Sequence, residues 1–195
     1  MILERNDNLI LPRRNFLGKA ANLTLSASAI GLLAGQSSLA NAQSDGGKDI
    51  AILNVALGLE HEAIGAYQLG AESGLLQKGV LDTAVLFQSH HKGHRDALIA
   101  TIEKLGGKPV ATKSQDDYAK ALNAATLKSQ GDVVELVRKL ELGAINAYLG
   151  VIPAFKDSNL AKVAGRLAAD ETMHWALLSN AVGKPVPGNA LYFGA

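Results

Sequence analysis

The sequence predicts an all-α protein that folds as a four-helix bundle, with a long crossover between the second and third helices. Three observations predict this fold class. Apolar residues recur at three- and four-residue steps in four segments, and no segment shows convincing strand alternation. The two halves of the chain also resemble each other. Each half is therefore expected to form one helical hairpin.

The first 42 residues have the pattern of an export signal. Arg13 and Arg14 precede Phe-Leu, residues 21–35 carry no charge, and an A-x-A cleavage pattern ends at Ala42. The arginine pair resembles a twin-arginine signal, which is read by the twin-arginine export machinery. A Sec signal and an uncleaved membrane anchor are the alternatives, but the apolar run is shorter than the about 18–20 residues that a spanning helix needs. We predict cleavage near Ala42 and an exported, periplasmic or similar, mature domain at residues 43–195.

The composition of this mature part excludes several classes of function. The whole chain has 19 basic and 18 acidic residues, of which the signal takes four basic and two acidic ones, so the mature charge is close to −1. This charge gives no reason to expect nucleic acid or an anionic membrane surface as a partner. We also expect a mature form that is not embedded in a membrane. The chain contains no cysteine, which excludes disulfides, thiol catalysis and iron–sulfur ligation.

The first two predicted helices cover residues 49–72 and 80–105. The "SGLLQKG" segment separates them, and "GGKP" ends the second as glycine followed by proline should. Each helix has one mainly apolar stripe that contains a few polar residues. The stripes are Leu53, Ala56, Leu57, Glu60, Ala63, Ile64 and Tyr67, and then Ala84, Phe87, His91, His94, Leu98, Ile102 and Leu105.

A long connection at residues 108–131 leads to the last two helices and contains one short helical candidate, "DDYAKALNAA". The third helix should begin with Asp132 as its cap and end or kink at Pro153. The fourth should begin at Asp157 or Ser158. Their stripes are Val134, Val137, Glu141, Ala144, Ile145 and Tyr148, and then Ala164, Leu167, Glu171, His174, Leu178 and Ala181.

The internal repeat aligns the polar residues of these stripes. "LEHEAIGAY" and "LELGAINAY" match at an offset of 81, and the second and fourth helices match at an offset of 80. The aligned pairs are Glu60 with Glu141, Tyr67 with Tyr148, His91 with Glu171, and His94 with His174. We therefore predict two antiparallel hairpins related by a pseudo-twofold axis.

Polar residues on inward stripes need compensation, because burying an unpaired carboxylate costs several kcal/mol. Residues three apart on a helix share one face, so two such side chains are able to reach one ion. One Glu from each of two helices and a Glu-x-x-His pair from each of the others is the ligand plan of di-iron and di-manganese bundles. The candidate metal ligands are Glu60, His91, His94, Glu141, Glu171 and His174.

With these residues, the chain resembles the ferritin-like superfamily, the group that includes ferritins, rubrerythrins and erythrins. It is most similar to small exported ferritin-like domain proteins with twin-arginine signals, over residues 49–182. The resemblance implies iron, as a di-iron or mononuclear site, and redox chemistry on oxygen, peroxide or ferrous iron. Because the rubredoxin-type cysteine site is missing, it also implies an external electron donor. A homodimer is compatible with it.

The second helix departs from the family pattern. His91 stands where the bridging glutamate is expected, followed by the expected His94, and Gln88-x-x-His91 is an alternative register. A neutral imidazole donates one lone pair, so it binds one ion without bridging two. Three carboxylates and two divalent ions give a formal charge of +1, which should stabilise oxidised metal states less well. Mixed imidazole and carboxylate ligands also suit manganese, zinc or copper.

The alternative interpretation is a non-catalytic, stress-protective or adaptor bundle whose polar residues bond to one another and to water. Several residues near the candidate ligands have other expected roles. His61, Glu62 and His90 lie off the inward stripes and are predicted to be solvated. Tyr67 and Tyr148 are predicted to be core aromatics, and Trp175 is predicted to be a packing residue.

Overall fold

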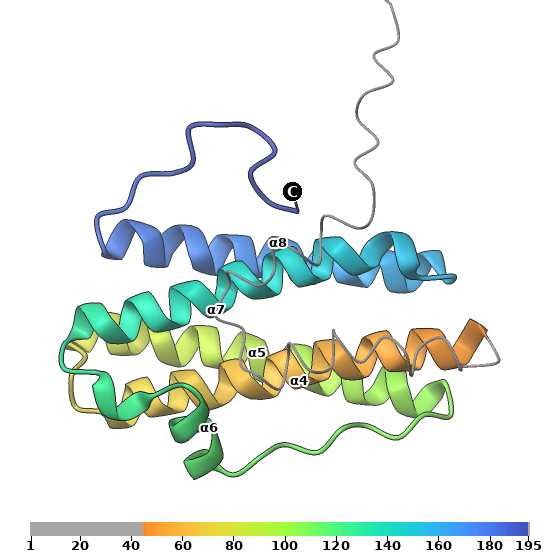
Figure 1. Cartoon of the computed structure of the whole chain (residues 1–195), viewed down its shortest axis with the longest axis horizontal. Helices are drawn as coiled ribbons and strands as arrows, with labels where there is room; N and C mark the ends of the chain where they lie inside the picture. The colour runs from red at the N-terminus through yellow and green to blue at the C-terminus, as the bar shows by residue number, and fades with distance from the viewer. Residues whose placement is uncertain (1–44, 195) are drawn as a thin grey trace, which may run out of the picture.

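A computed structural model describes residues 45–194 of the chain (Figure 1). This range contains α-helices and no strand, which confirms the all-α class, and none of its helices is long and apolar enough to cross a membrane. The predicted export signal lies outside the described residues. The α-helices are α4 (Asp45–Glu72), α5 (Lys78–Lys104), α6 (Gln115–Ala121), α7 (Gln130–Val151) and α8 (Ser158–Ala181), with 3-10 helices η2 (Ala124–Thr126) and η3 (Ile152–Ala154).

The four long helices form two antiparallel hairpins that lie against each other. Figure 1 shows α4 beside α5 in one layer and α7 beside α8 in the other. The connection from α5 to α7 runs back along the bundle and carries α6, so that α7 starts at the same end as α5. The predicted four-helix bundle with a long crossover between its second and third helices is therefore confirmed.

Two apolar clusters fill the bundle, and in every long helix the candidate ligands lie between them in sequence. One cluster includes Leu57, Leu98, Ile102, Tyr148 and Leu167, and the other includes Tyr67, Phe87, Val134, Val137 and Leu178. Full burial of one large apolar side chain is worth about 1.5–3 kcal/mol relative to exposure. The packed layers on both sides therefore hold a polar layer in the middle of the bundle, where it is largely shielded from solvent.

The helix boundaries follow their capping residues. α8 begins at Ser158, one of the two predicted starts, and its N-cap Asp157 accepts a hydrogen bond from the backbone N–H of Asn159. The prediction that Asp132 caps α7 is wrong, because Ser129 holds that position and accepts from the Asp132 N–H. The Asp132 carboxylate in turn accepts from the Ser129 hydroxyl and the Lys128 N–H, in the reciprocal manner of a capping box. This arrangement starts the helix earlier than expected.

The crossover connection packs on α4. A Cβ atom on Gly65 would lie 2.7 Å from the Tyr118 ring, so glycine is what allows α6 to approach this closely. Asn54 Oδ1 accepts a hydrogen bond from the Val110 N–H at 2.7 Å, and His61 Nε2 lies 3.2 Å from the Val110 carbonyl oxygen. The prediction that His61 is solvated is therefore wrong: it is 8 % exposed because the connection covers its face of α4.

The segment after α8 folds back over the α7–α8 hairpin (Figure 1). Its Tyr192 and Phe193 rings lie 6.0 and 5.2 Å from the Trp175 ring, centroid to centroid. The Arg138 guanidinium carbon lies 5.9 Å from the same ring, a cation–π distance. Trp175 is buried and acts in packing, as the sequence predicts.

Candidate metal centre

The four long helices bring all six candidate ligands into one buried layer. α4 contributes Glu60, α7 contributes Glu141, and α5 and α8 contribute the pairs three residues apart. Five of the six side chains are at most 2 % exposed, and His94 is 12 % exposed. Gln88, from the alternative register, donates instead to the Ile64 carbonyl oxygen and the Gln68 side chain. The structure thus brings His91, with His94, into the layer and directs Gln88 toward α4.

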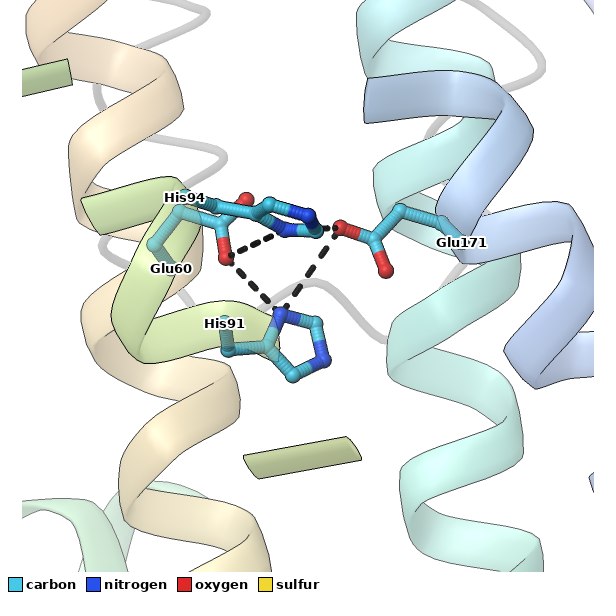
Figure 2. Close-up of side chains that lie close together, drawn as sticks. All are labelled: Glu60, His91, His94 and Glu171. Carbon is cyan, nitrogen blue, oxygen red and sulfur yellow. Dashed lines mark hydrogen bonds and ion pairs between the residues drawn. The ribbon is translucent and has the colours of Figure 1, made fainter. Parts of the chain in front are cut away.

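One group of donors consists of Glu60, His91, His94 and Glu171, which point toward one another in Figure 2. Their donor atoms all lie within 4.8 Å of one another. His91 Nδ1 lies 2.8 Å from Glu60 Oε2, and His94 Nδ1 lies 3.2 Å from Glu171 Oε1. Two imidazole nitrogens and two carboxylates therefore face a common centre.

A second group consists of His91, Glu141, Glu171 and His174, again with donor atoms within 4.8 Å of one another. His174 Nδ1 lies 2.9 Å from Glu171 Oε2 and 3.4 Å from Glu141 Oε1. His91 Nε2 lies 3.2 Å from Glu141 Oε1. Glu171 and His91 belong to both groups, and each turns one donor atom toward one group and its other donor atom toward the second.

Several donor atoms of this layer have no hydrogen-bond partner. Within residues 45–194, five buried side-chain nitrogen or oxygen atoms make no hydrogen bond, and three of them belong to candidate ligands. These three are His94 Nδ1, Glu141 Oε2 and Glu171 Oε1; the first and the last lie 3.2 Å apart as an ion pair, without hydrogen-bond geometry. Buried polar atoms normally make hydrogen bonds, so three in one layer that make none need an explanation. A bound cation satisfies such atoms, and these residues therefore fit a metal ion.

The pKa values of the three carboxyl groups depend on their burial and on the neighbouring imidazoles of the layer. Burial raises the pKa of Glu60, but the charge and hydrogen bond of His91, together with the neighbouring His94, outweigh it and lower this pKa to about 2. The pKa of Glu141 is lowered for the same kind of reason, through His91 and His174. Burial dominates at Glu171 and raises the pKa of that carboxyl, despite the hydrogen bond from His174 and the ion pair with His94.

The pKa values of the three imidazoles are all raised. Burial lowers the pKa of His94, but its contacts with the Glu171 and Glu60 carboxylates outweigh it and raise this pKa to about 10. The pKa of His91 is raised well above its usual value, because Glu141 and Glu60 outweigh the effect of burial. The pKa of His174 is also raised, through Glu141 and Glu171. Without metal, the layer therefore holds imidazolium groups against carboxylates.

Two tyrosines connect the hairpins through the glutamates. The Tyr67 hydroxyl on α4 donates to Glu141 Oε1 at 2.5 Å, and the Tyr148 hydroxyl on α7 donates to Glu60 Oε1. Burial and the neighbouring carboxylates raise the pKa of both phenols well above the usual range, so both stay protonated. They are buried, as predicted for core aromatics, but each also orients a candidate ligand of the other hairpin. These reciprocal bonds follow the internal repeat.

The outer nitrogens of two candidate ligands also have repeat-related partners. His94 Nε2 lies 3.2 Å from Asp170 Oδ2, and His174 Nε2 lies 2.9 Å from His90 Nδ1. His90 and Asp170 are 80 residues apart and directly precede His91 and Glu171, so the repeat was the signal that could have identified them. The prediction that His90 is solvated holds only in part, because the side chain is half-buried and stacks on His174 at 5.2 Å.

The prediction for Glu62 is also wrong. The sequence places it off the inward stripe, which predicts a solvated carboxylate, but the side chain is 5 % exposed. It lines a small cavity of about 10 Å³ together with Glu60, His91 and Glu141. The reason is that α7 packs against α4 on that side, so two adjacent faces of α4 are covered rather than one stripe. Glu62 therefore lies next to the candidate centre.

Comparisons with known proteins agree with this fold. The family described as "Ferritin-like domain" matches residues 48–184. A conserved hypothetical protein from Mycobacterium tuberculosis has a similar crystal structure, with a TM-score of 0.64 and 20 % sequence identity, covering 75 % of this chain and 99 % of that one. None of the curated proteins matches. The chain belongs to the ferritin-like domain family.

Proposed function

We propose that this protein is an exported ferritin-like protein that binds metal, most consistently iron, in the buried layer between its four long helices. The observation that carries the proposal is the pair of overlapping donor groups, in which His94, Glu141 and Glu171 each keep one buried donor atom that makes no hydrogen bond. A buried layer of this kind is costly unless a cation or a complete hydrogen-bond network compensates it. The network is incomplete, which supports the cation.

The donor set favours a divalent first-row metal. Three carboxylates and three imidazoles offer oxygen and nitrogen donors and no sulfur, which suits iron, manganese, zinc or copper. Membership of the ferritin-like family supports iron within this group. Bound iron would supply redox chemistry with oxygen, peroxide or ferrous iron, with electrons from an external donor.

The residues of the chain would hold and prepare this metal in three ways. His91, His94 and His174 must each lose a proton before a ring nitrogen donates its lone pair, because an imidazolium has none to give. Tyr67 and Tyr148 fix the orientation of Glu141 and Glu60 through their hydroxyls. The Phe87 ring stacks on His174 at 4.1 Å and helps to exclude water from that side.

A second candidate function is a non-catalytic, protective or adaptor bundle without metal. The observation that favours it is charge balance: three imidazolium groups and three carboxylates sum to zero when all are ionised, so the layer is able to persist without a cation. The raised pKa values of His91, His94 and His174 fit this state. The unpaired donor atoms are what weigh against it.

Export by the twin-arginine route completes the proposal and concerns residues outside the described range. Replacing Arg13 and Arg14 by lysine should leave precursor in the cytoplasm, because a receptor reads the arginine pair rather than the charge alone. Cell fractionation measures the result. Normal export of the double variant would show that another route suffices.

Crystals soaked in cobalt(II) test the metal function directly. Anomalous diffraction should place cobalt among the six donors of the parent protein, with ligand distances of roughly 2.0–2.2 Å. The same soak of Glu171→Ala should show weaker peaks, because this residue contributes to both donor groups. Glu72→Ala, which changes an exposed residue at the end of α4, is the matched control. Cobalt bound only outside the polar layer would contradict the proposal.

A further inference from the structure

We propose that the bundle has a second binding site, an apolar cavity that takes a small uncharged apolar molecule and holds it against Tyr67, beside the candidate metal centre. The cavity has a volume of about 200 Å³ and lies among α4, α5, α7 and α8. It is distinct from the polar layer, because none of the six candidate ligands lines it.

The cavity has a buried inner end and an exposed mouth. Tyr67, Val134, Val137 and Leu178 are buried lining residues at the inner end. Leu177, which is 52 % exposed, and the exposed Ala181 line the mouth. A molecule that enters from solvent past α8 would therefore meet the Tyr67 ring among mainly apolar side chains.

The lining selects an uncharged ligand. No charged side chain lines the cavity, and the polar side chains there are Tyr67 and Thr83. Both hydroxyl protons are already used, by Glu141 Oε1 at 2.5 Å and by the Gly79 carbonyl oxygen at 3.0 Å. Apolar cavities of about 150 Å³ bind molecules such as benzene or xenon, and a water at this lining would find few of the two to four polar partners that it needs. This cavity exceeds that volume, so it fits a ligand of roughly six to ten carbon atoms.

Tyr67 places such a ligand next to the polar layer. Its ring lies 6.3 Å from the Phe87 ring and 5.4 Å from the His91 ring, and its hydroxyl holds Glu141. A molecule that fills the cavity would contact the residue that orients a candidate ligand. The molecule would then act as a substrate or effector of the centre. This role rests on the proposed metal function, whereas binding in the cavity does not.

The test is a titration of the full mature protein with benzene, followed by methyl NMR and by the thermal midpoint. Binding should be saturable in the parent, and benzoate, which has a similar ring but a charge, should not compete. Ala84→Leu adds three carbon atoms to a lining residue and should weaken benzene binding at least about tenfold, a difference of about 1.4 kcal/mol. Ala100→Leu, the same change at an exposed position on the same helix, should leave the affinity unchanged.

A second measurement covers the case in which Ala84→Leu does not fold. Crystals of the parent protein under xenon pressure should show a xenon atom inside the cavity. No saturable benzene binding, equal binding by Ala84→Leu and Ala100→Leu, or an empty cavity under xenon would overturn the proposal. Iron content, measured on the same samples, separates the two claims. Iron without benzene binding refutes only the cavity site, and benzene binding without iron refutes only the metal function.

Discussion

Metal binding to this protein should release protons, and the number released is set by the imidazoles of the polar layer. The pKa of His94 is raised to about 10, so at pH 7 about one molecule in a thousand has a neutral imidazole there. The pKa values of His91 and His174 are raised as well. Each imidazole that becomes a ligand must therefore lose a proton to solvent.

This requirement determines how steeply the metal affinity rises with pH. One proton released per metal raises the logarithm of the affinity by about one for each pH unit, and three protons raise it by about three. Between pH 6 and pH 7 we thus expect the apparent affinity for zinc to rise by about tenfold to 1,000-fold. Calorimetry in two buffers with different ionisation enthalpies counts the protons directly. An affinity that does not change with pH, or heats that do not depend on the buffer, would refute the reasoning.

Two variants sharpen this measurement. His94→Gln should lower the number of protons released by about one, because its amide carries no titrating proton. His61→Gln changes an imidazole that lies outside both donor groups, so it should leave the number unchanged. Equal proton release from the parent and both variants would show that the imidazoles of the polar layer are not the groups that titrate.

Three further predictions concern the same layer and its support. His91→Glu restores the fourth carboxylate, so it should raise the iron content towards two per chain and speed the oxidation of ferrous iron in air; no gain in either measurement counts against His91 as a ligand. The metal-free protein should be most stable between about pH 4.5 and 6.5 in denaturant titrations. In the folded protein the pKa of Glu60 is about 2, below its ordinary 4.5, so the stabilisation from this carboxylate is lost as the pH falls from 4.5 towards 2. The folded pKa of His94 is about 10, above its ordinary 6.5, so the stabilisation from this imidazolium is lost as the pH rises from 6.5 towards 10. Gly65→Ala should destabilise the fold by about 1–3 kcal/mol, because its Cβ would lie 2.7 Å from the Tyr118 ring, whereas Gly93→Ala, with open space around it, should not.

The helices and the candidate ligands were predictable because both are periodic. The spacing of apolar residues predicted the four long helices. The internal repeat predicted that His91 and His94 align with Glu171 and His174. What the sequence could not supply is which further faces of a helix become covered. The crossover connection buries His61, and α7 packs beside Glu62, although both residues lie off the inward stripe of α4.

The hydrogen bonds between the two hairpins also could not be predicted from the spacing of residues along one helix. Tyr67 and Tyr148 lie two helical turns from Glu60 and Glu141 on their own helices, which suggests no contact with a ligand. Because α4 and α7 run in opposite directions, each tyrosine instead reaches the glutamate of the other helix. Such bonds depend on the relative direction and height of two helices that are far apart in sequence.

The measurement that tests the central claim most directly is elemental analysis of the mature protein, purified after export by its own signal. We predict one to two iron ions per chain in the parent and in Glu72→Ala, and a clear loss in Glu171→Ala, which removes a carboxylate from both donor groups. Less than about a tenth of an ion of any first-row metal per chain would contradict the claim. In that case the imidazolium and carboxylate groups form a charge-balanced core without metal.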